Sequence, residues 1–361
     1  MSETPRDWRD LPAFDDRNGL RNGWPWCPKH SDDPDFQEPD FIAPPRRFDS
    51  LPQVVVVTPS FHQAEYVEET IRSVLLQRYP RLCYRVRDAA SDDGTGDILE
   101  RYRPYFDELI IAADDGQSGA IADAIEGDQE GWFGWINSDD RLEPHTLWRL
   151  ANALNGRDRL PDLVTFDVRC IGDGEPYVMR NENLSATAML RDDRYAIAQP
   201  GWWFRLNRLH ECGGIRRTLQ YGFDWDLMVR YLALDPHWYG DPHIGATFRV
   251  HADSKTASES GSSINRFNVE AERIRDLLEN EMPEPLVRAS KLGRRRKPWH
   301  DRLIQALDDY EASPLVSTTR LAIDAMKDPP ARITMRTLAT MGRLLSRYVR
   351  PRHAWDKTLG S

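Results

Sequence analysis

Between residues 53 and 154, short apolar runs alternate with amphipathic segments, and this alternation constrains the fold more than any other feature. The first run holds four consecutive valines, and β-branched runs of this kind are typical of central parallel strands. Strands are predicted at 53–58, 82–87, 109–112 and 132–136, and helices at 64–77, 98–102, 118–125 and 147–154. Alternation with short loops predicts an α/β fold with a mostly parallel sheet and right-handed crossovers.

The length of the chain sets its domain organisation. With 361 residues, of which 40% are hydrophobic, it can form one large or two ordinary domains with a substantial core. We predict an irregular arm at 1–50, held to the body by Trp24, Trp26 and Phe41. The α/β domain is predicted to occupy 51–282, with a further helix at 222–234 and a late strand at 246–250. A basic helical extension is predicted at 283–361.

Charge is unevenly distributed along the chain. The whole sequence carries a net charge of −10, whereas residues 284–361 hold 16 Lys and Arg against 8 Asp and Glu. An acidic body argues against a nucleic-acid partner, and a basic extension favours contact with an anionic membrane surface. In the last predicted helix one face holds five arginines, Arg332, Arg336, Arg343, Arg347 and Arg350. That helix can lie in a membrane interface or pack on the body, and both interpretations stay open.

The sequence also indicates a compartment. No stretch approaches the roughly 20 apolar residues that span a bilayer, and the polar N-terminus lacks the apolar core of a secretory signal. The cysteines are far apart, without metal-ligand spacing, and are predicted to be reduced thiols: Cys27, Cys83, Cys170 and Cys212. We expect a cytoplasmic protein that is peripheral on the inner face of the membrane.

The pair Asp139-Asp140 directly follows the predicted buried strand at 132–136. Two adjacent carboxylates are costly to bury without partners. At the carboxyl edge of an α/β sheet, where ligands usually bind, they can instead hold a divalent cation. The alternative is that residues 138–140 merely cap the helix that begins near Pro144.

The order of motifs along residues 53–255 resembles a known family. The motifs are Thr58-Pro59-Ser60-Phe61, Asp88 with the segment 91–95, Gly116-Gln117-Ser118, Asn137-Ser138-Asp139-Asp140, Gln199-Pro200, residues 223–227 and residues 248–251 with Ser254-Lys255. Together they resemble a family 2 inverting glycosyltransferase of the GT-A fold, the nucleotide-diphospho-sugar transferase fold. Each motif is weak alone, and their shared order makes the match.

The resemblance implies transfer of a sugar from a nucleotide-sugar donor to a hydroxyl of a glycan or lipid-linked acceptor, in surface polysaccharide synthesis. It implies a divalent cation, Mn²⁺ or Mg²⁺, with Asp139 and Asp140 as ligands. The donor nucleotide would be bound by Thr58, Pro59, Ser60, Asp88, Gln117, Asn137 and Asp139. Ordinary turns or caps remain the alternative for residues 58–60 and for Asp88. The cluster at 92–95 is predicted to be a turn and helix cap.

An acceptor hydroxyl needs a general base, because a neutral alcohol is a poor nucleophile. By the resemblance this base is Asp224, at the start of the predicted helix at 222–234. The alternative is that Asp224 only stabilises the helix N-terminus by its charge. Asp226 and Arg230, four residues apart, are predicted to form an ion pair within this helix.

Three further positions match the family less firmly. His251 is a candidate metal ligand, although a single His after a strand is often structural. Lys255 is a candidate diphosphate contact. Trp202 and Trp203 lie where the family forms its acceptor side, and core packing is the alternative for both.

Donor identity and chemistry each leave alternatives. Asp115 stands where a basic residue is frequent and Gly119 where an acidic one is frequent. A UDP-sugar is favoured, while guanosine and thymidine diphosphate sugars stay open. One alternative function is a catalytically silent GT-A module that binds a glycan or partner protein, since Asn137 and Phe223 replace common acidic residues. Another is a sugar-phosphate nucleotidyltransferase, although residues 58–65 lack the glycine and lysine of a triphosphate loop.

Overall fold

The computed structural model describes residues 51–154, 157, 159–172, 174–181, 185–192, 198–251 and 261–308, with short pieces at 321–322, 324–327, 337–338 and 340–341. The predicted arm at 1–50, Lys255 and the five arginines of the last predicted helix lie outside the described residues.

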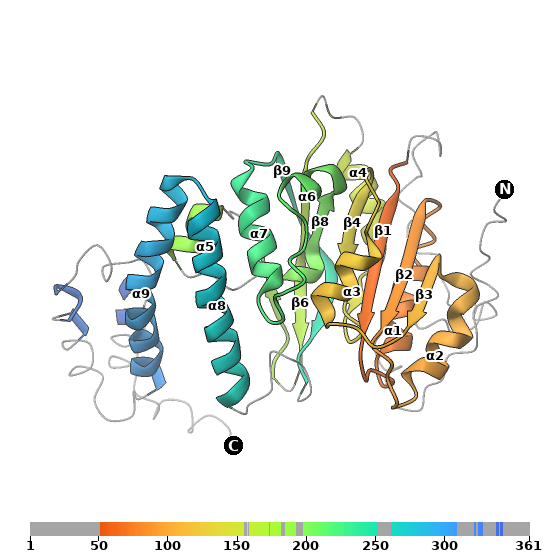
Figure 1. Ribbon diagram of the computed structural model, residues 1–361, viewed down its shortest axis with the longest axis horizontal. Helices are drawn as coiled ribbons and strands as arrows, with labels where there is room; N and C mark the ends of the chain where they lie inside the picture. Colours follow the sequence, from red (N-terminus) through yellow and green to blue (C-terminus); the bar gives the residue numbers. More distant parts are fainter. Residues whose placement is uncertain are drawn as a thin grey trace, which may run out of the picture. The chain divides into compact units, whose positions relative to one another are not determined.

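The strands form one mixed sheet in the order β3-β2-β1-β4-β8-β6-β9-β5, with β7 paired to β6 (Figure 1). They are β1 (Val54–Ser60), β2 (Leu82–Asp88), β3 (Glu108–Ile111), β4 (Trp132–Trp135), β5 (Arg141–Leu142), β6 (Leu163–Ile171), β7 (Tyr177–Met179), β8 (Trp202–Arg205) and β9 (Trp238–Arg249).

The helices follow the strands as the alternating pattern predicts. They are α1 (Val67–Leu75), α2 (Thr95–Tyr102), α3 (Gln117–Ala124), α4 (Thr146–Leu154), α5 (Ala186–Arg191), α6 (Leu206–Glu211), α7 (Phe223–Ala233), α8 (Gly261–Glu281) and α9 (Glu284–Asp308). Two 3-10 turns lie at Arg103–Tyr105 and Gln199–Gly201.

The first half of the sheet is parallel, as predicted. β1 pairs in parallel with both β2 and β4, and β2 pairs in parallel with β3. All seven residues of β1 are buried, because both faces of this central strand are covered. In this register Ser60 lies opposite Asp88, so the carboxyl ends of β1 and β2 meet at the same edge of the sheet.

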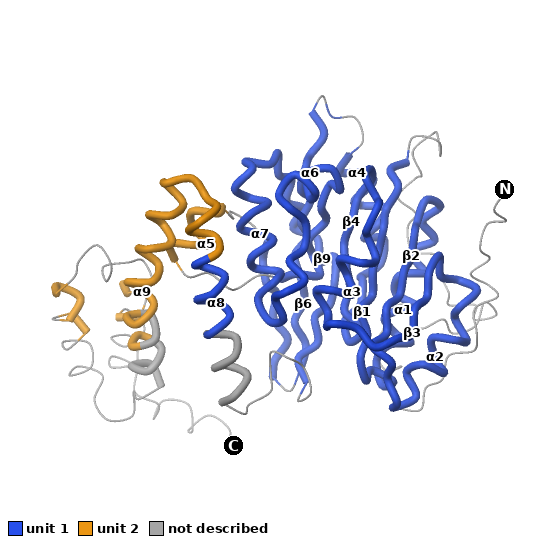
Figure 2. The backbone as a smooth tube through the Cα atoms, in the orientation of Figure 1, with its two compact units in different colours: residues 1–184, 196–276 blue, residues 185–195, 277–361 orange. Residues whose placement is uncertain are grey.

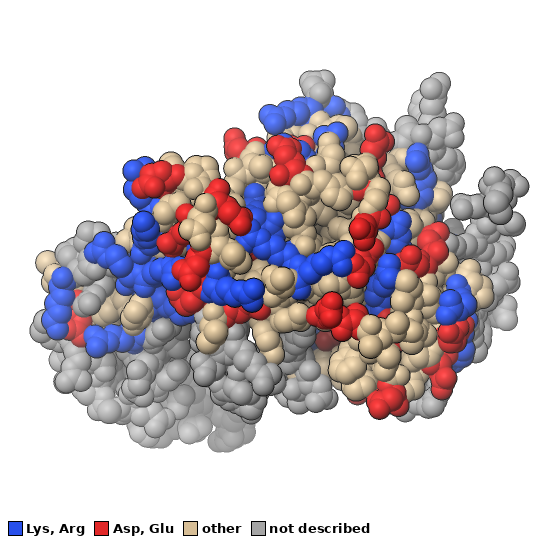
Figure 3. Space-filling model, in the orientation of Figure 1, with Lys and Arg blue, Asp and Glu red and all other residues tan. Residues whose placement is uncertain are grey.

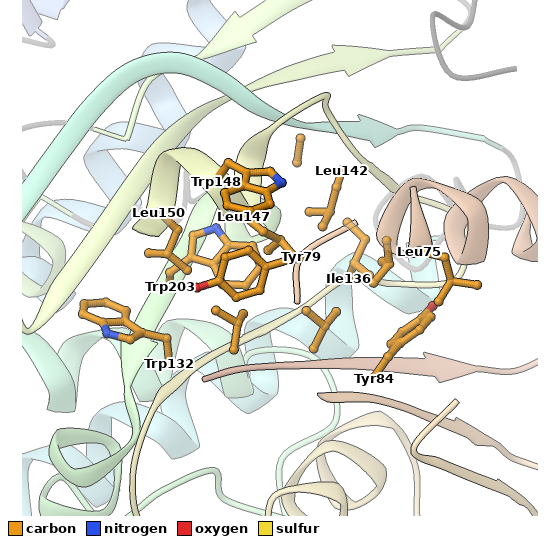
Figure 4. Packing of buried hydrophobic residues seen from close by; sticks show 14 of the residues in the cluster. Leu75, Tyr79, Tyr84, Trp132, Ile136, Leu142, Leu147, Trp148, Leu150 and Trp203 are labelled. Carbon is orange, nitrogen blue, oxygen red and sulfur yellow. The ribbon is translucent and has the colours of Figure 1, made fainter. Parts of the chain in front are cut away.

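The second half of the sheet departs from the parallel prediction. β8 runs antiparallel to both β4 and β6, and it inserts the Trp202-Trp203 pair between them. The ring of Trp203 packs so closely on Gly134 of β4 that an added Cβ there would lie 2.8 Å from it. Figure 4 shows Trp203 among the labelled core residues Trp132, Leu147 and Leu150. Gly134 therefore makes room for an indole within the core.

The Cα trace divides into two compact units, coloured separately in Figure 2. The first unit comprises residues 1–184 and 196–276 and contains the whole sheet. The second comprises residues 185–195 and 277–361, in which α5 packs against α9. A small apolar cluster around Trp299 and Leu303 forms the core of the second unit. None of the helices in the described part of the chain has the length and apolar character needed to cross a bilayer.

Candidate functional site

The turn that follows β4 carries the Asp139-Asp140 pair at the carboxyl edge of the sheet. Asp139 Oδ2 lies 3.1 Å from Nε2 of His251, which follows β9 and is 112 residues away in sequence. Both side chains are mostly buried, with 17% and 13% of their surfaces exposed. The structure thus brings together two of the residues that the sequence nominates as metal ligands.

Asp140 ties the ends of β4 and β9 to each other. Its Oδ1 accepts a 2.8 Å hydrogen bond from the backbone N–H of Arg249, and its Oδ2 accepts one of 3.3 Å from Nδ2 of Asn137. Burial and the neighbouring charge of Asp139 raise the pKa of Asp140 well above its usual value. These contacts support a structural tie that places His251 beside Asp139, and they do not support Asp140 as a metal ligand.

Helix α1 supports the turn that carries Asp139 and Asp140. This support was not predicted from the sequence. The Thr70 hydroxyl donates to the backbone carbonyls of Ser138 at 3.0 Å and Asp140 at 2.6 Å. Glu69, one residue earlier, accepts a 2.5 Å hydrogen bond from the Arg249 guanidinium. The polar residues of an amphipathic helix give no local sign that they face a strand end, because that depends on tertiary packing.

An aromatic contact holds the imidazole of His251. Its ring lies 4.8 Å from the ring of Tyr66, measured between centroids, and the guanidinium of Arg249 lies 4.4 Å from the centre of the same ring. Burial and the neighbouring Glu65 raise the pKa of Tyr66 to about 12, so this phenol stays neutral at ordinary pH. Tyr66 thus places an uncharged aromatic ring next to the His251 imidazole.

Gln117 and Asn137, both nominated for the donor nucleotide, contact each other. Gln117 is the first residue of α3, and its Nε2 donates a 2.7 Å hydrogen bond to Oδ1 of Asn137. Gly116 precedes it with φ of 103°, a backbone conformation that favours glycine. The N-terminus of α3 and the turn after β4 are therefore joined at one edge of the sheet.

The nominated residues at the ends of β1 and β2 differ in their surroundings. The Thr58 hydroxyl is buried and hydrogen-bonded to the Tyr84 hydroxyl at 3.0 Å, so this side chain belongs to the core. Ser60 is the last residue of β1. Asp88 accepts two 2.8 Å hydrogen bonds from the backbone and hydroxyl of Ser91, which is the turn contact that the sequence left as an alternative.

The loops after β1 and β2 are hydrogen-bonded to each other. The backbone N–H groups of His62, Gln63 and Ala64 donate to Ser91 Oγ, Thr95 Oγ1 and Asp93 Oδ2, at 2.8, 2.9 and 3.0 Å. Asp93 also accepts from the backbone of Thr95 at 3.0 Å. The predicted turn at 92–95 is confirmed, with α2 beginning at Thr95.

Asp224 lies in the first turn of α7, partly exposed, where its Oδ1 accepts a 2.8 Å hydrogen bond from the backbone of Trp225. The ring of Phe223, one residue earlier, packs 5.8 Å from the ring of Trp135, the last residue of β4. The start of α7 therefore lies against the strand whose end carries Asp139.

The predicted ion pair in α7 is confirmed. Asp226 Oδ2 accepts hydrogen bonds of 2.9 and 2.6 Å from Nε and Nη2 of Arg230, and both side chains are buried. Arg216 adds a second cation at 2.9 Å from Asp226 Oδ1. Two guanidinium groups compensate this buried carboxylate and fix the direction of α7.

Trp202 and Trp203 are only 1% and 2% exposed. They therefore pack in the core, and the expectation that they line an acceptor side is wrong for this structure. Their neighbour Gln199 has a clear structural role. Its Nε2 donates a 2.9 Å hydrogen bond to the backbone carbonyl of Trp135. Lys255, the candidate diphosphate contact, lies outside the described residues.

The residues at this edge fit a divalent cation as partial ligands. Among the described residues, no three His, Cys, Asp or Glu side chains gather closely enough to hold a metal ion by themselves. Mg²⁺ and similar ions that act on nucleotides are usually held by one or two protein groups, with substrate phosphates and water completing the coordination. Asp139 and His251 provide a carboxylate oxygen and an imidazole nitrogen for such a site.

The mostly parallel first half of the sheet, with helices between its strands, is similar to the GT-A fold. The S. aureus TarS 1–349 structure in complex with UDP-GlcNAc superposes with a TM-score of 0.52 and 16% identity, covering 64% of this chain and 68% of that one. At this identity the likeness shows the fold alone.

Sequence comparison finds a family model and named relatives that match part of the chain. Residues 55–218 match the model of Glycosyl transferase family 2. TuaG of Bacillus subtilis, a glycosyltransferase named for teichuronic acid biosynthesis, is 33% identical over 99 residues. The glycosyltransferase AglE of Haloferax volcanii is 31% identical over 104 residues. Each match covers 27% of this chain, and the chain spans 39% of TuaG and 34% of AglE.

Proposed function

We propose that this protein is a metal-dependent inverting glycosyltransferase that moves a sugar from a nucleotide-sugar donor to a hydroxyl of a glycan or lipid-linked acceptor. The observation that carries the proposal is the 3.1 Å contact between Asp139 and His251 at the carboxyl edge of the sheet. Ligands of open α/β sheets bind at this edge, and two adjacent metal-ligand side chains there suit a nucleoside diphosphate with its cation.

Asp139 and His251 would hold the cation, and Asn137 and Gln117 would contact the donor beside it. The cation would supply Lewis acidity that neutralises the negative charge of the departing diphosphate. Asp140 keeps the ends of β4 and β9 together, so that His251 stays next to Asp139. Ser60, Pro59 and Asp88, at the ends of β1 and β2, would bind the base and ribose.

Asp224 would act as the general base. In a single displacement, the acceptor oxygen attacks the anomeric carbon as the bond from that carbon to the diphosphate oxygen breaks. The acceptor proton passes to the Asp224 carboxylate, and the sugar inverts its configuration. The contact between Phe223 and Trp135 supports this role, because it keeps Asp224 near the strand end that carries Asp139.

A UDP-sugar is the favoured donor, by analogy with TarS, whose solved complex contains UDP-GlcNAc. The test is thermal unfolding with UDP, GDP or dTDP, each with and without Mn²⁺ or Mg²⁺. We expect UDP to stabilise the protein only when metal is present, by about 2.7 kcal/mol at a hundredfold excess over Kd. If none of the three nucleotides stabilised the protein, the proposal of an active glycosyltransferase would be contradicted. The alternative of a catalytically silent GT-A module would then be favoured.

We further propose that α9 docks on an anionic membrane. One face of α9 carries exposed basic side chains at helical spacing, Arg288, Lys291, Arg295 and Arg302. Basic side chains are visible over this helix at the left of Figure 3. Each cation near an anionic bilayer contributes about 1 kcal/mol of attraction.

This docking is tested with sedimented vesicles. The protein is expected to sediment with phosphatidylcholine vesicles that contain about 30% phosphatidylserine, and not with vesicles of phosphatidylcholine alone. Charge reversal at Arg288, Lys291 and Arg295 to Glu should abolish sedimentation. Equal sedimentation of that variant would refute the role of α9.

A further inference from the structure

The loop that joins α6 to α7 contacts the helix that leads into the proposed donor site. The contacts are made by residues 217–222, the last part of this connection, which we call the 217–222 loop. The Ser118 hydroxyl of α3 donates a 3.1 Å hydrogen bond to the backbone carbonyl of Arg217. Gln220 Nε2 donates one of 2.8 Å to the carbonyl of Asp115, and the Gln220 side chain fills the space where a Cβ of Gly116 would lie. The loop is thus fastened to the start of α3.

The same loop is held from its other side by a single carboxylate of α8. Glu270 Oε1 accepts from the backbone N–H of Gln220 at 2.8 Å. Its Oε2 accepts from the N–H groups of Tyr221 at 2.5 Å and Gly222 at 2.8 Å. Three successive N–H groups therefore converge on one side chain. Hydrogen bonds to a charged acceptor are stronger than neutral ones, so this clamp is firm.

The clamp lies directly before the proposed general base. Gly222, the last clamped residue, immediately precedes α7, and Asp224 is the second residue of that helix. A helix N-terminus leaves N–H groups without intrahelical partners, and a carboxylate placed there fixes where the helix begins. The 217–222 loop therefore joins the donor side, through Gln220 and Asp115, to the start of the helix that carries Asp224.

We propose that Glu270 is a positioning residue, which sets the distance between Asp224 and the donor by clamping the 217–222 loop. The proposal rests on the proposed function, in which Asp224 receives the acceptor proton. Glu270 has no contact with donor or acceptor in this scheme. Its loss would misplace the base without removing donor contacts, and a misplacement of about 1 Å costs roughly 100-fold in rate.

The test uses the full chain with Glu270→Gln, which keeps the shape of the side chain and removes its charge. The assay is nucleoside diphosphate release, with Mn²⁺ and water as acceptor, from UDP-, GDP- and dTDP-sugars in turn. The donor that the wild type consumes is used for all variants. We expect kcat to fall about 10- to 100-fold while KM for the donor stays within about twofold. Glu281→Gln, an exposed charge removal in the same helix, is expected to match the wild type.

Hydrogen exchange separates positioning from general loss of structure. In Glu270→Gln, the amides of residues 220–224 are expected to exchange faster, while those of the sheet remain protected. Glu270→Asp, which keeps the charge on a shorter side chain, should recover part of kcat. If the wild type is active and kcat is unchanged in Glu270→Gln, the role of Glu270 alone is overturned. The same holds if kcat falls, KM for the donor rises and the sheet loses its protection all together in that variant. A wild type that consumes no donor would overturn the proposed function itself.

Discussion

Replacing Asp224 by Asn is expected to lower kcat for sugar transfer about 10²- to 10⁴-fold, the usual contribution of a positioned general base. Asn has nearly the same shape and can still accept the backbone hydrogen bond from Trp225, so α7 should be retained. Donor binding should also be retained, because in the proposed mechanism Asp224 would contact the acceptor rather than the nucleotide. The measurement is steady-state transfer, with metal-dependent nucleotide stabilisation followed in parallel.

The matched control for this variant is Asp235→Asn, beyond the other end of the same helix. Asp235 is exposed and has φ of 50°, a left-handed conformation that Asn also tolerates. It should transfer sugar at the wild-type rate. If Asp224→Asn also transferred at that rate, Asp224 would be only a charge at the helix N-terminus, the alternative that the sequence left open.

Replacing Asp139 by Asn is expected to reduce transfer about 10²- to 10³-fold or more, the typical cost of removing one group that stabilises transition-state charge. The neutral amide is a weaker cation ligand, and it leaves His251 without its charged neighbour. In contrast to Asp224→Asn, this variant should also lose the metal-dependent stabilisation by nucleotide. Both effects are measured on the same preparation, by transfer kinetics and by thermal unfolding.

Asp97→Asn removes an exposed carboxylate from the first turn of α2 and serves as the control for Asp139→Asn. It is expected to keep both transfer and metal-dependent stabilisation. The proposed metal site would be wrong if Asp139→Asn kept its stabilisation by nucleotide and metal.

The alternating half of the fold could be predicted because local signals decide it. The run of four valines predicts β1. The turns at Asp93 and Gly116 predict where α2 and α3 begin. The antiparallel strand β8 was missed. Four residues with two tryptophans fit a strand, a core cluster or a sugar platform equally well. The close approach to Gly134, 69 residues earlier, and the packing on Trp132 and Leu150 place Trp203 in the core.

The candidate site was predictable in part, for the same reason. Residues near the strand ends were nominated from their motifs, and the i, i+4 pair of Asp226 and Arg230 followed from helix geometry. The tie from Asp140 to Arg249 spans 109 residues, and the clamp on Gly222 by Glu270 spans 48. Such contacts depend on how separate elements pack, so no local pattern announces them.

The central claim is that a cation lies at the carboxyl edge of the sheet, between Asp139, His251 and a nucleoside diphosphate. Its most direct test is an anomalous difference map from crystals of the protein grown with UDP and Mn²⁺. We predict one Mn²⁺ peak about 2.0–2.6 Å from an Asp139 oxygen, with diphosphate oxygens completing the coordination. A nucleotide bound elsewhere, or bound at this edge with its Mn²⁺ away from Asp139, would contradict the claim.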